Sequence, residues 1–208
     1  MGDRIDRHRR FLLLGGASAL ALGAVPARAA LDPTPRQTRG PFYPDKLPLD
    51  SDNDLVRVDG RAALAAGVIT DLTGRVLDPS GQPVDDARIE IWQCDANGRY
   101  HHANARQAGR DPNFQGFGTF TTGSDGRYRF RTIRPVPYPG RTPHIHFRVV
   151  APGTRELITQ MYIAGHPGNA NDWILRSAGE ARSRLLVEFR PADDADAEQQ
   201  ARFDIVVG

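Results

Sequence analysis

The chain has very little sulfur, with one cysteine, Cys94, and two methionines among 208 residues. A single cysteine excludes an intramolecular disulfide, so the fold depends on packing and hydrogen bonds. After residue 29 the sequence also lacks any basic run interleaved with aromatic residues. It therefore gives no indication of a nucleic-acid partner. Internal repeats and low-complexity tracts are missing as well.

No apolar run is long and continuous enough for a convincing transmembrane span, and the stretch near the N-terminus matches a secretory signal better. Arg9 and Arg10 precede the apolar run Phe11–Val25, and a small-x-small sequence follows at residues 27–29. The arginine pair is similar to twin-arginine signals, which we favour over ordinary secretion, although ordinary secretion stays open. We expect residues 1–29 to engage the export machinery and to be removed near Ala29. The mature protein would then lie in the periplasm or outside the cell, without a stable membrane anchor.

The basic character of the chain belongs to this N-terminal segment. Residues 1–29 hold five arginines and two aspartates, so their removal changes the formal net charge from +2 to −1. Residues 30–208 suit one domain with a substantial core. Residues 30–64 contain several prolines and show little periodicity, which indicates an extended N-terminal arm. The folded domain is expected at 65–208.

Short apolar-alternating runs recur between turn signals in this domain and predict an antiparallel β-sandwich. We expect about eight strands with long loops, in a prealbumin-like arrangement. The predicted strands are Val68–Leu77, Ala87–Gln93, Gly118–Thr122, Tyr128–Ile133, His144–Val150, Leu157–Ile163, Leu185–Phe189 and Phe203–Val207. A helical turn or two is expected at Asn171–Ser183. Trp92, Phe130 and Phe147 are expected to pack in the core rather than against a ligand.

Two histidines on one predicted strand form a candidate pair of metal ligands. His144 and His146 are one residue apart, so their side chains lie on the same face of the strand. The intervening Ile145 and the following Phe147 point to the opposite, buried face. An H-x-H pair alone leaves two possibilities open. It occurs as a ligand pair in zinc, copper and iron sites, and it also occurs as two hydrogen-bonded histidines on a protein surface.

The neighbouring motifs decide between these possibilities. The segments WQCDANGRY, DPNFQG, DGRYRFRTI and PYPGRTPHIHF follow in order, and they bring Tyr100 and Tyr138 together with the two histidines. This combination resembles the intradiol ring-cleavage dioxygenase family, which includes protocatechuate 3,4-dioxygenases and catechol 1,2-dioxygenases. The resemblance begins at Gln37, in QTRGPFYP, continues through Tyr162 and becomes weaker toward the C-terminus.

The resemblance implies one non-haem Fe(III) held by two tyrosinates and two histidines. Tyr100 and His144 would be equatorial ligands, and Tyr138 and His146 axial ones. Phenolate oxygens are hard anionic donors that suit a trivalent ion. Tyr138 would also act as a base that is released when a catechol binds, and coordination would keep it ionised near neutral pH.

The substrates implied are a catecholic small molecule and O2, and the product is a muconate-type dicarboxylic acid. Arg141 matches the arginine that the family places beside the substrate, where a fixed cation stabilises developing negative charge. Gln160 matches a family glutamine close to the same site. We therefore expect Arg141, Tyr138 and Gln160 to be the catalytic residues.

The chain also departs from the better-known members of this family. Only five residues separate Tyr138 from His144, which suggests a more open substrate mouth. The helical N-terminal domain of catechol 1,2-dioxygenases is missing, so their dimer is not assumed and the oligomeric state stays open. The ring substituents of the substrate stay open too. The alternative function is a non-catalytic prealbumin-like binding module, or an inactive homologue.

Overall fold

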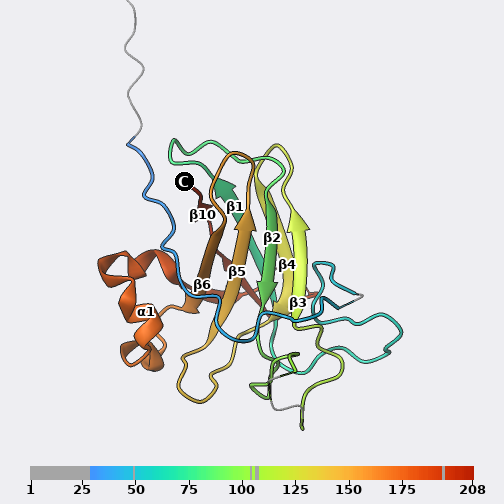
Figure 1. The fold of residues 1–208 in the computed structure, drawn as a ribbon. Coiled ribbons are helices and arrows are strands. Elements are labelled where there is room, and N and C mark those ends of the chain that lie inside the picture. Colours follow the sequence, from blue (N-terminus) through green and yellow to red (C-terminus); the bar gives the residue numbers. More distant parts are fainter. Residues whose placement is uncertain (1–28, 49, 104, 106–107, 194) are drawn as a thin grey trace, which may run out of the picture.

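The computed structural model describes residues 29–208 except 49, 104, 106, 107 and 194. The signal predicted at residues 1–29 therefore lies, apart from its last residue, outside the described residues. Within the described part of the chain, no helix has the length and apolar character needed to cross a membrane. Two five-stranded sheets form the framework of the described fold (Figure 1).

The first sheet is built around β1, which pairs with β4 in antiparallel orientation and with β9 and β10 in parallel. Its strands are β1 (Ile69–Leu77), β4 (Arg127–Ile133), β8 (Phe189–Pro191), β9 (Gln199–Arg202) and β10 (Ile205–Val206). The second sheet has the order β3-β2-β5-β6-β7. Its strands are β2 (Arg88–Trp92), β3 (Phe117–Thr121), β5 (His144–Val150), β6 (Leu157–Ile163) and β7 (Leu186–Val187).

The predicted β-sandwich is confirmed, and β5 and β6 have the bounds expected from the sequence. The C-terminal part differs in detail. The strand expected at residues 185–189 is divided at Glu188 into β7 and β8, which belong to different sheets. Three short strands form parallel pairs: β7 pairs with β6, and β9 and β10 pair with β1. Each of them reaches that partner through a crossover connection rather than a hairpin.

Helical structure is present where it was expected, at Asn171–Ser183, and one further short helix precedes that region. The helices are η1 (Pro167–Ala170), α1 (Trp173–Ser177) and η2 (Gly179–Leu185). Asp172 caps α1, because its Oδ1 accepts hydrogen bonds from the backbone N–H groups of Ile174 (3.1 Å) and Leu175 (3.0 Å). The cap fixes the start of α1 beside the second sheet.

The main core collects apolar side chains from both sheets. Phe147 of β5, Ile91 of β2 and Phe130 of β4 are all buried in it. Phe147 also packs edge-on against Phe203, with ring centroids 5.1 Å apart. The expected core positions of Phe130 and Phe147 are confirmed.

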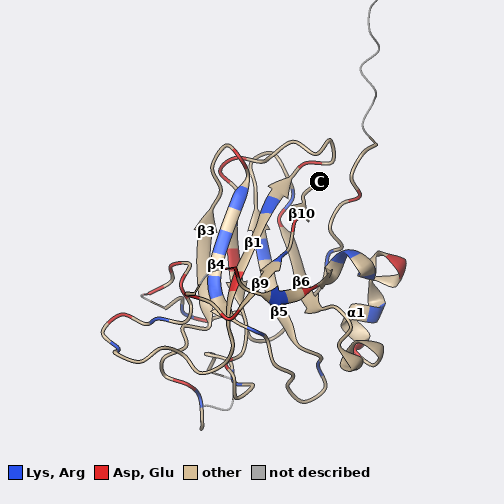
Figure 2. Cartoon of the chain, turned by 180° about the vertical axis from the view of Figure 1, so that it is seen from behind, with Lys and Arg blue, Asp and Glu red and all other residues tan. Residues whose placement is uncertain are grey.

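The outer faces of the two sheets differ. On β4, Arg127 and Arg129 are exposed, whereas Tyr128 and Phe130, which alternate with them, are buried. Figure 2 shows this charged face. The outer face of the second sheet is instead covered by the chain that precedes β1. Gln37 donates its backbone N–H to the Ile158 carbonyl (2.8 Å), and this segment runs across β5 and β6 in Figure 1.

The first sheet tolerates no side chain at Gly74, in the middle of β1. A Cβ there would overlap the Phe203 carbonyl oxygen and lie 2.7 Å from Tyr128 Oη, which donates a hydrogen bond to that same carbonyl. Gly74→Ala should therefore lower the free energy of unfolding by about 1–3 kcal/mol, measured by urea denaturation. Gly123→Ala is the control, because nothing lies within 4 Å of its Cβ position. Equal stability of the two variants would contradict this packing.

Candidate functional site

Strand β5 presents His144 and His146 on the outer face of the second sheet, as the alternation predicted. Its register aligns His146 with Trp92 of β2 and with Gln160 of β6, and it aligns His144 with Tyr162. Cross-strand partners share a face of the sheet. The two histidines therefore lie in a row with a glutamine, a tyrosine and a tryptophan.

The two imidazoles point their Nε2 atoms at each other, 3.2 Å apart. His144 Nδ1 donates to the Thr142 carbonyl (2.7 Å), because a carbonyl can only accept, and this leaves a lone pair on Nε2. Burial lowers the pKa of His144 to about 4, with the nearby charge of Arg141 acting in the same direction. Burial likewise holds the pKa of His146 well below its ordinary value. Both rings are therefore neutral at pH 7 and able to act as ligands.

Tyr100 reaches the same point from the loop after β2. Asp95 Oδ1 accepts the N–H groups of Asn97 and Arg99 (both 2.9 Å), and Gly98 takes a positive φ of 70°. This turn delivers the Tyr100 hydroxyl to 3.5 Å from His144 Nε2. Burial raises the pKa of Tyr100 well above its usual value, so it is a neutral phenol unless a cation is close.

Tyr138 approaches from the loop before β5. Its ring centroid lies 5.6 Å from that of Tyr100 and 5.5 Å from that of His144. The turn is closed by the Arg141 backbone N–H, which donates to the Tyr138 carbonyl (2.9 Å). Burial raises the pKa of Tyr138, and the Arg141 guanidinium acts against this rise. The four predicted ligands thus come together from three separate segments.

The donor set fits a hard, highly charged ion. Two nitrogen donors about 2.1 Å from one metal, on adjacent coordination positions, lie about 3 Å apart, close to the separation of the two Nε2 atoms. Within the described residues, no group of three or more His, Cys, Asp or Glu side chains is arranged to hold a metal. A metal bound at the two imidazoles would take its remaining protein ligands from the phenol oxygens, which suit a trivalent ion better than zinc.

Aromatic rings surround the four donors. Trp92 stacks on His146, with centroids 4.8 Å apart and planes 6° apart. Phe42 of the N-terminal arm stacks on Tyr100 (4.7 Å), and both border a cavity of 240 Å³ that Tyr138 also lines. Trp92 is buried as expected, but in a small cluster under the site with Cys94, Tyr100 and Phe117. Burial raises the pKa of Cys94 to about 12, which keeps it a thiol.

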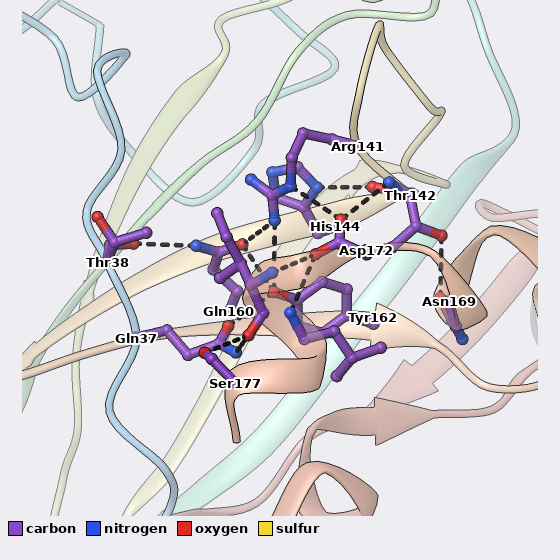
Figure 3. A network of polar contacts seen from close by, with 12 residues as sticks. Gln37, Thr38, Arg141, Thr142, His144, Gln160, Tyr162, Asn169, Asp172 and Ser177 are labelled. Atoms are coloured by element: carbon purple, nitrogen blue, oxygen red, sulfur yellow. Dashed lines mark hydrogen bonds and ion pairs between the residues drawn. The ribbon is translucent and has the colours of Figure 1, made fainter. Parts of the chain in front are cut away.

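Arg141 and Gln160, the other predicted site residues, contact each other. Arg141 Nη2 donates to Gln160 Oε1 (2.7 Å), and the guanidinium lies beside the His144 ring (Figure 3). The Tyr162 hydroxyl oxygen lies 2.9 Å from Gln160 Oε1, and Gln160 Nε2 donates to the Thr38 carbonyl (2.9 Å). The amide of Gln160 therefore has a single orientation, which links the arginine to the N-terminal arm.

The sequence did not indicate three further residues of this network. Asp172 accepts from Arg141 Nε (2.8 Å), and the Tyr162 hydroxyl donates to Gln37 Oε1 (2.7 Å). Asp172 precedes the apolar run of α1, which is a recognisable N-cap signal. That signal predicts a helix start but carries no information about an arginine 31 residues earlier in the chain.

Comparisons with known proteins agree with this geometry. The family model described as "Dioxygenase" matches residues 38–208. The protocatechuate 3,4-dioxygenase beta chain of Burkholderia cepacia is 40% identical over 188 residues, covering 83% of this chain and 78% of that protein. The catechol 1,2-dioxygenase of Candida albicans is 33% identical over 76% of this chain, which spans only 54% of that enzyme.

Solved structures give the same result. The dioxygenase domain of a carbohydrate-binding fusion protein from Streptomyces sp. SirexAA-E superposes with a TM-score of 0.66 at 32% identity, covering 84% of this chain and 97% of that one. Residues 38–208, the range matched by the family model, include both sheets and the segments that carry the tyrosines and histidines. The chain therefore belongs to the intradiol ring-cleavage dioxygenase family of oxidoreductases.

Proposed function

We propose that this protein is an Fe(III)-dependent dioxygenase that opens a catechol ring between its two hydroxyl-bearing carbons, using O2 and giving a muconate-type dicarboxylic acid. The observation that carries the proposal is the convergence of one buried and one half-buried phenol with two neutral imidazoles on one point. The named relatives, which are a protocatechuate, a catechol and several hydroxyquinol dioxygenases, support the substrate class.

Tyr100, Tyr138, His144 and His146 would hold the iron. When bound, ferric iron would withdraw electron density from a coordinated catechol and so prepare the ring for reaction with dioxygen. Tyr138 is the less enclosed of the two tyrosines, half-buried where Tyr100 is buried. We assign to its oxygen the acceptance of a catechol proton, and we assign to Tyr100 the role of the tyrosinate that stays in place.

Arg141 would stabilise negative charge as it develops on the ring. Its side chain is only 9% exposed, and it is held beside the donor cluster before any substrate arrives. A preorganised charge in a poorly solvated site costs no reorganisation during the reaction, and one such donor is typically worth about a hundredfold in rate. Gln160 would act mainly by holding the guanidinium through its Oε1.

Export is a separate part of the proposal. The arginine pair Arg9-Arg10, the apolar run that follows and the small residues at 27–29 support a twin-arginine signal. Because that route carries folded proteins, iron could enter the site before export. Residues 30–64 would then form the N-terminal arm of the mature protein, and residues 65–208 its catalytic domain.

Oxygen uptake by the iron-loaded protein tests the reaction class. Catechol, protocatechuate, hydroxyquinol and chlorinated catechols should be compared, with ring opening followed by mass spectrometry. We expect uptake of one O2 per ring opened with at least one of them. A protein that binds iron but consumes no oxygen would be an inactive homologue. A protein that takes up no iron, and therefore stays colourless, would be a binding module.

Iron should bind at about one ion per chain, as four protein ligands to a single ion imply. Bound iron should also quench the fluorescence of Trp92, which stacks on His146, and should leave the fluorescence of the exposed Trp173 unchanged. His146→Ala removes a ligand and should weaken iron binding by more than about tenfold. His166→Ala is the control and should bind normally. Zinc in place of iron in an active preparation would contradict the assignment.

The two tyrosines should differ in their effects on the visible spectrum. Tyr138→Phe should still bind some iron and catechol but turn over at least about a hundredfold more slowly, because a proton acceptor is lost. Tyr100→Phe should remove the tyrosinate absorption of the substrate complex, since Tyr100 is the tyrosinate expected to remain there. If Tyr138→Phe, rather than Tyr100→Phe, removes that absorption, the two roles are reversed.

The export proposal predicts that replacing both arginines by lysine stops translocation. The charge is kept in the Arg9→Lys, Arg10→Lys variant, but the arginine pair is lost. Cell fractionation should find the uncleaved chain inside the cell, whereas the unaltered protein should be exported and begin near residue 30 by mass spectrometry. Unchanged export of the variant would indicate ordinary secretion instead.

A further inference from the structure

Asp172 is buried at the junction between α1 and the candidate site, and its side chain is completely covered. Its two oxygens have different partners (Figure 3). Oδ1 caps α1 through the N–H groups of Ile174 and Leu175. Oδ2 accepts from Arg141 Nε at 2.8 Å and from the Thr142 backbone N–H at 3.1 Å. One carboxylate thus joins a helix start to the loop before β5.

The contact determines the orientation of the Arg141 guanidinium. Nε is held by Asp172, while Nη2 donates to Gln160 Oε1 (2.7 Å) and lies 3.4 Å from the Tyr162 hydroxyl. These partners come from two directions, α1 and β6, so they fix both the position and the plane of the group. Without Asp172, only the contacts from β6 would remain.

The charge of Asp172 is matched to this role. Burial opposes ionisation of its carboxyl, but hydrogen bonds from Arg141 and from the backbone of Leu175 outweigh burial and lower its pKa. It is therefore an anion at neutral pH, and it lies against a cation that is itself nearly covered. A buried cation that loses its anionic partner is left uncompensated and turns toward water or toward other acceptors.

We propose that Asp172 is the positioning residue for Arg141 in the ring-cleavage reaction, through the bond from Arg141 Nε to Asp172 Oδ2. The proposal rests on the proposed function. Asp172 would not touch the substrate. It would hold the guanidinium where negative charge develops, so its loss should affect turnover much more than binding.

A purely structural role, as the cap of α1, is the competing explanation, and two variants separate it from positioning. Asp172→Ser keeps a good N-cap but loses the contact to Arg141. Asp172→Asn keeps one oxygen, which cannot satisfy both the helix N–H groups and the guanidinium. Asp204→Asn is the control, because Asp204 also pairs with an arginine and accepts a backbone N–H, but it lies between β9 and β10, at the first sheet.

The experiment is a double-mutant cycle on the iron-loaded protein, combining each Asp172 variant with Arg141→Ala. Iron content, kcat and KM are measured with the substrate that the wild-type protein turns over fastest. We expect both Asp172 variants to lower kcat about ten- to a hundredfold with normal iron content and with KM changed less than about threefold. In the Arg141→Ala background the same substitutions should change kcat less than about twofold. Asp204→Asn should match the wild type.

Three results would overturn the inference. One is an equal loss of kcat with and without Arg141, which would make Asp172 a structural residue. The second is a loss of iron that accounts for the loss of activity. The third is normal turnover by both Asp172 variants. A wild-type protein that binds iron but consumes no oxygen would instead refute the proposed function, and the inference with it, before any variant is compared.

Discussion

Strand β5 carries the sandwich core and the candidate metal donors on opposite faces of one short backbone segment. Ile145 and Phe147 turn toward the main core, while His144 and His146 turn outward. A slip of one residue in the pairing of β5 would exchange these faces and bury the imidazoles among apolar side chains. The same register aligns Trp92 and Gln160 with His146. Everything else in the site is arranged around this row.

The electrostatics of the cluster follow from its burial. Burial disfavours charge, so it raises the pKa values of Tyr100 and Tyr138 and lowers those of His144 and His146. All four groups are then neutral when no ion is bound, and the site avoids isolated buried charges. A highly charged ion would favour the ionised form of the two phenols. It would leave the imidazoles uncharged, because imidazole binds a metal as a neutral ligand. Affinity for such an ion should therefore rise with pH.

Local pattern in the sequence was enough to predict β5 and β6, and the alternation in HIHFRVV placed His144 and His146 on one face. Tyr100, Tyr138, Arg141 and Gln160 were indicated by the resemblance to the intradiol dioxygenases rather than by local pattern. The roles of these residues in iron binding and catalysis stay predictions. Contacts across long sequence separations were not predictable in this way. Asp172 meets Arg141 only because α1 packs beside β6, and the division of residues 185–189 between two sheets depends on where their partners lie.

We propose that Tyr100, Tyr138, His144 and His146 together bind one ferric ion. The most direct measurement is a crystal structure of the iron-loaded protein with diffraction data collected on both sides of the iron absorption edge. We expect one anomalous peak per chain, enclosed by the two tyrosine oxygens and the two histidine Nε2 atoms. A peak bound elsewhere, or none in crystals of protein that contains iron and is active, would contradict this proposal.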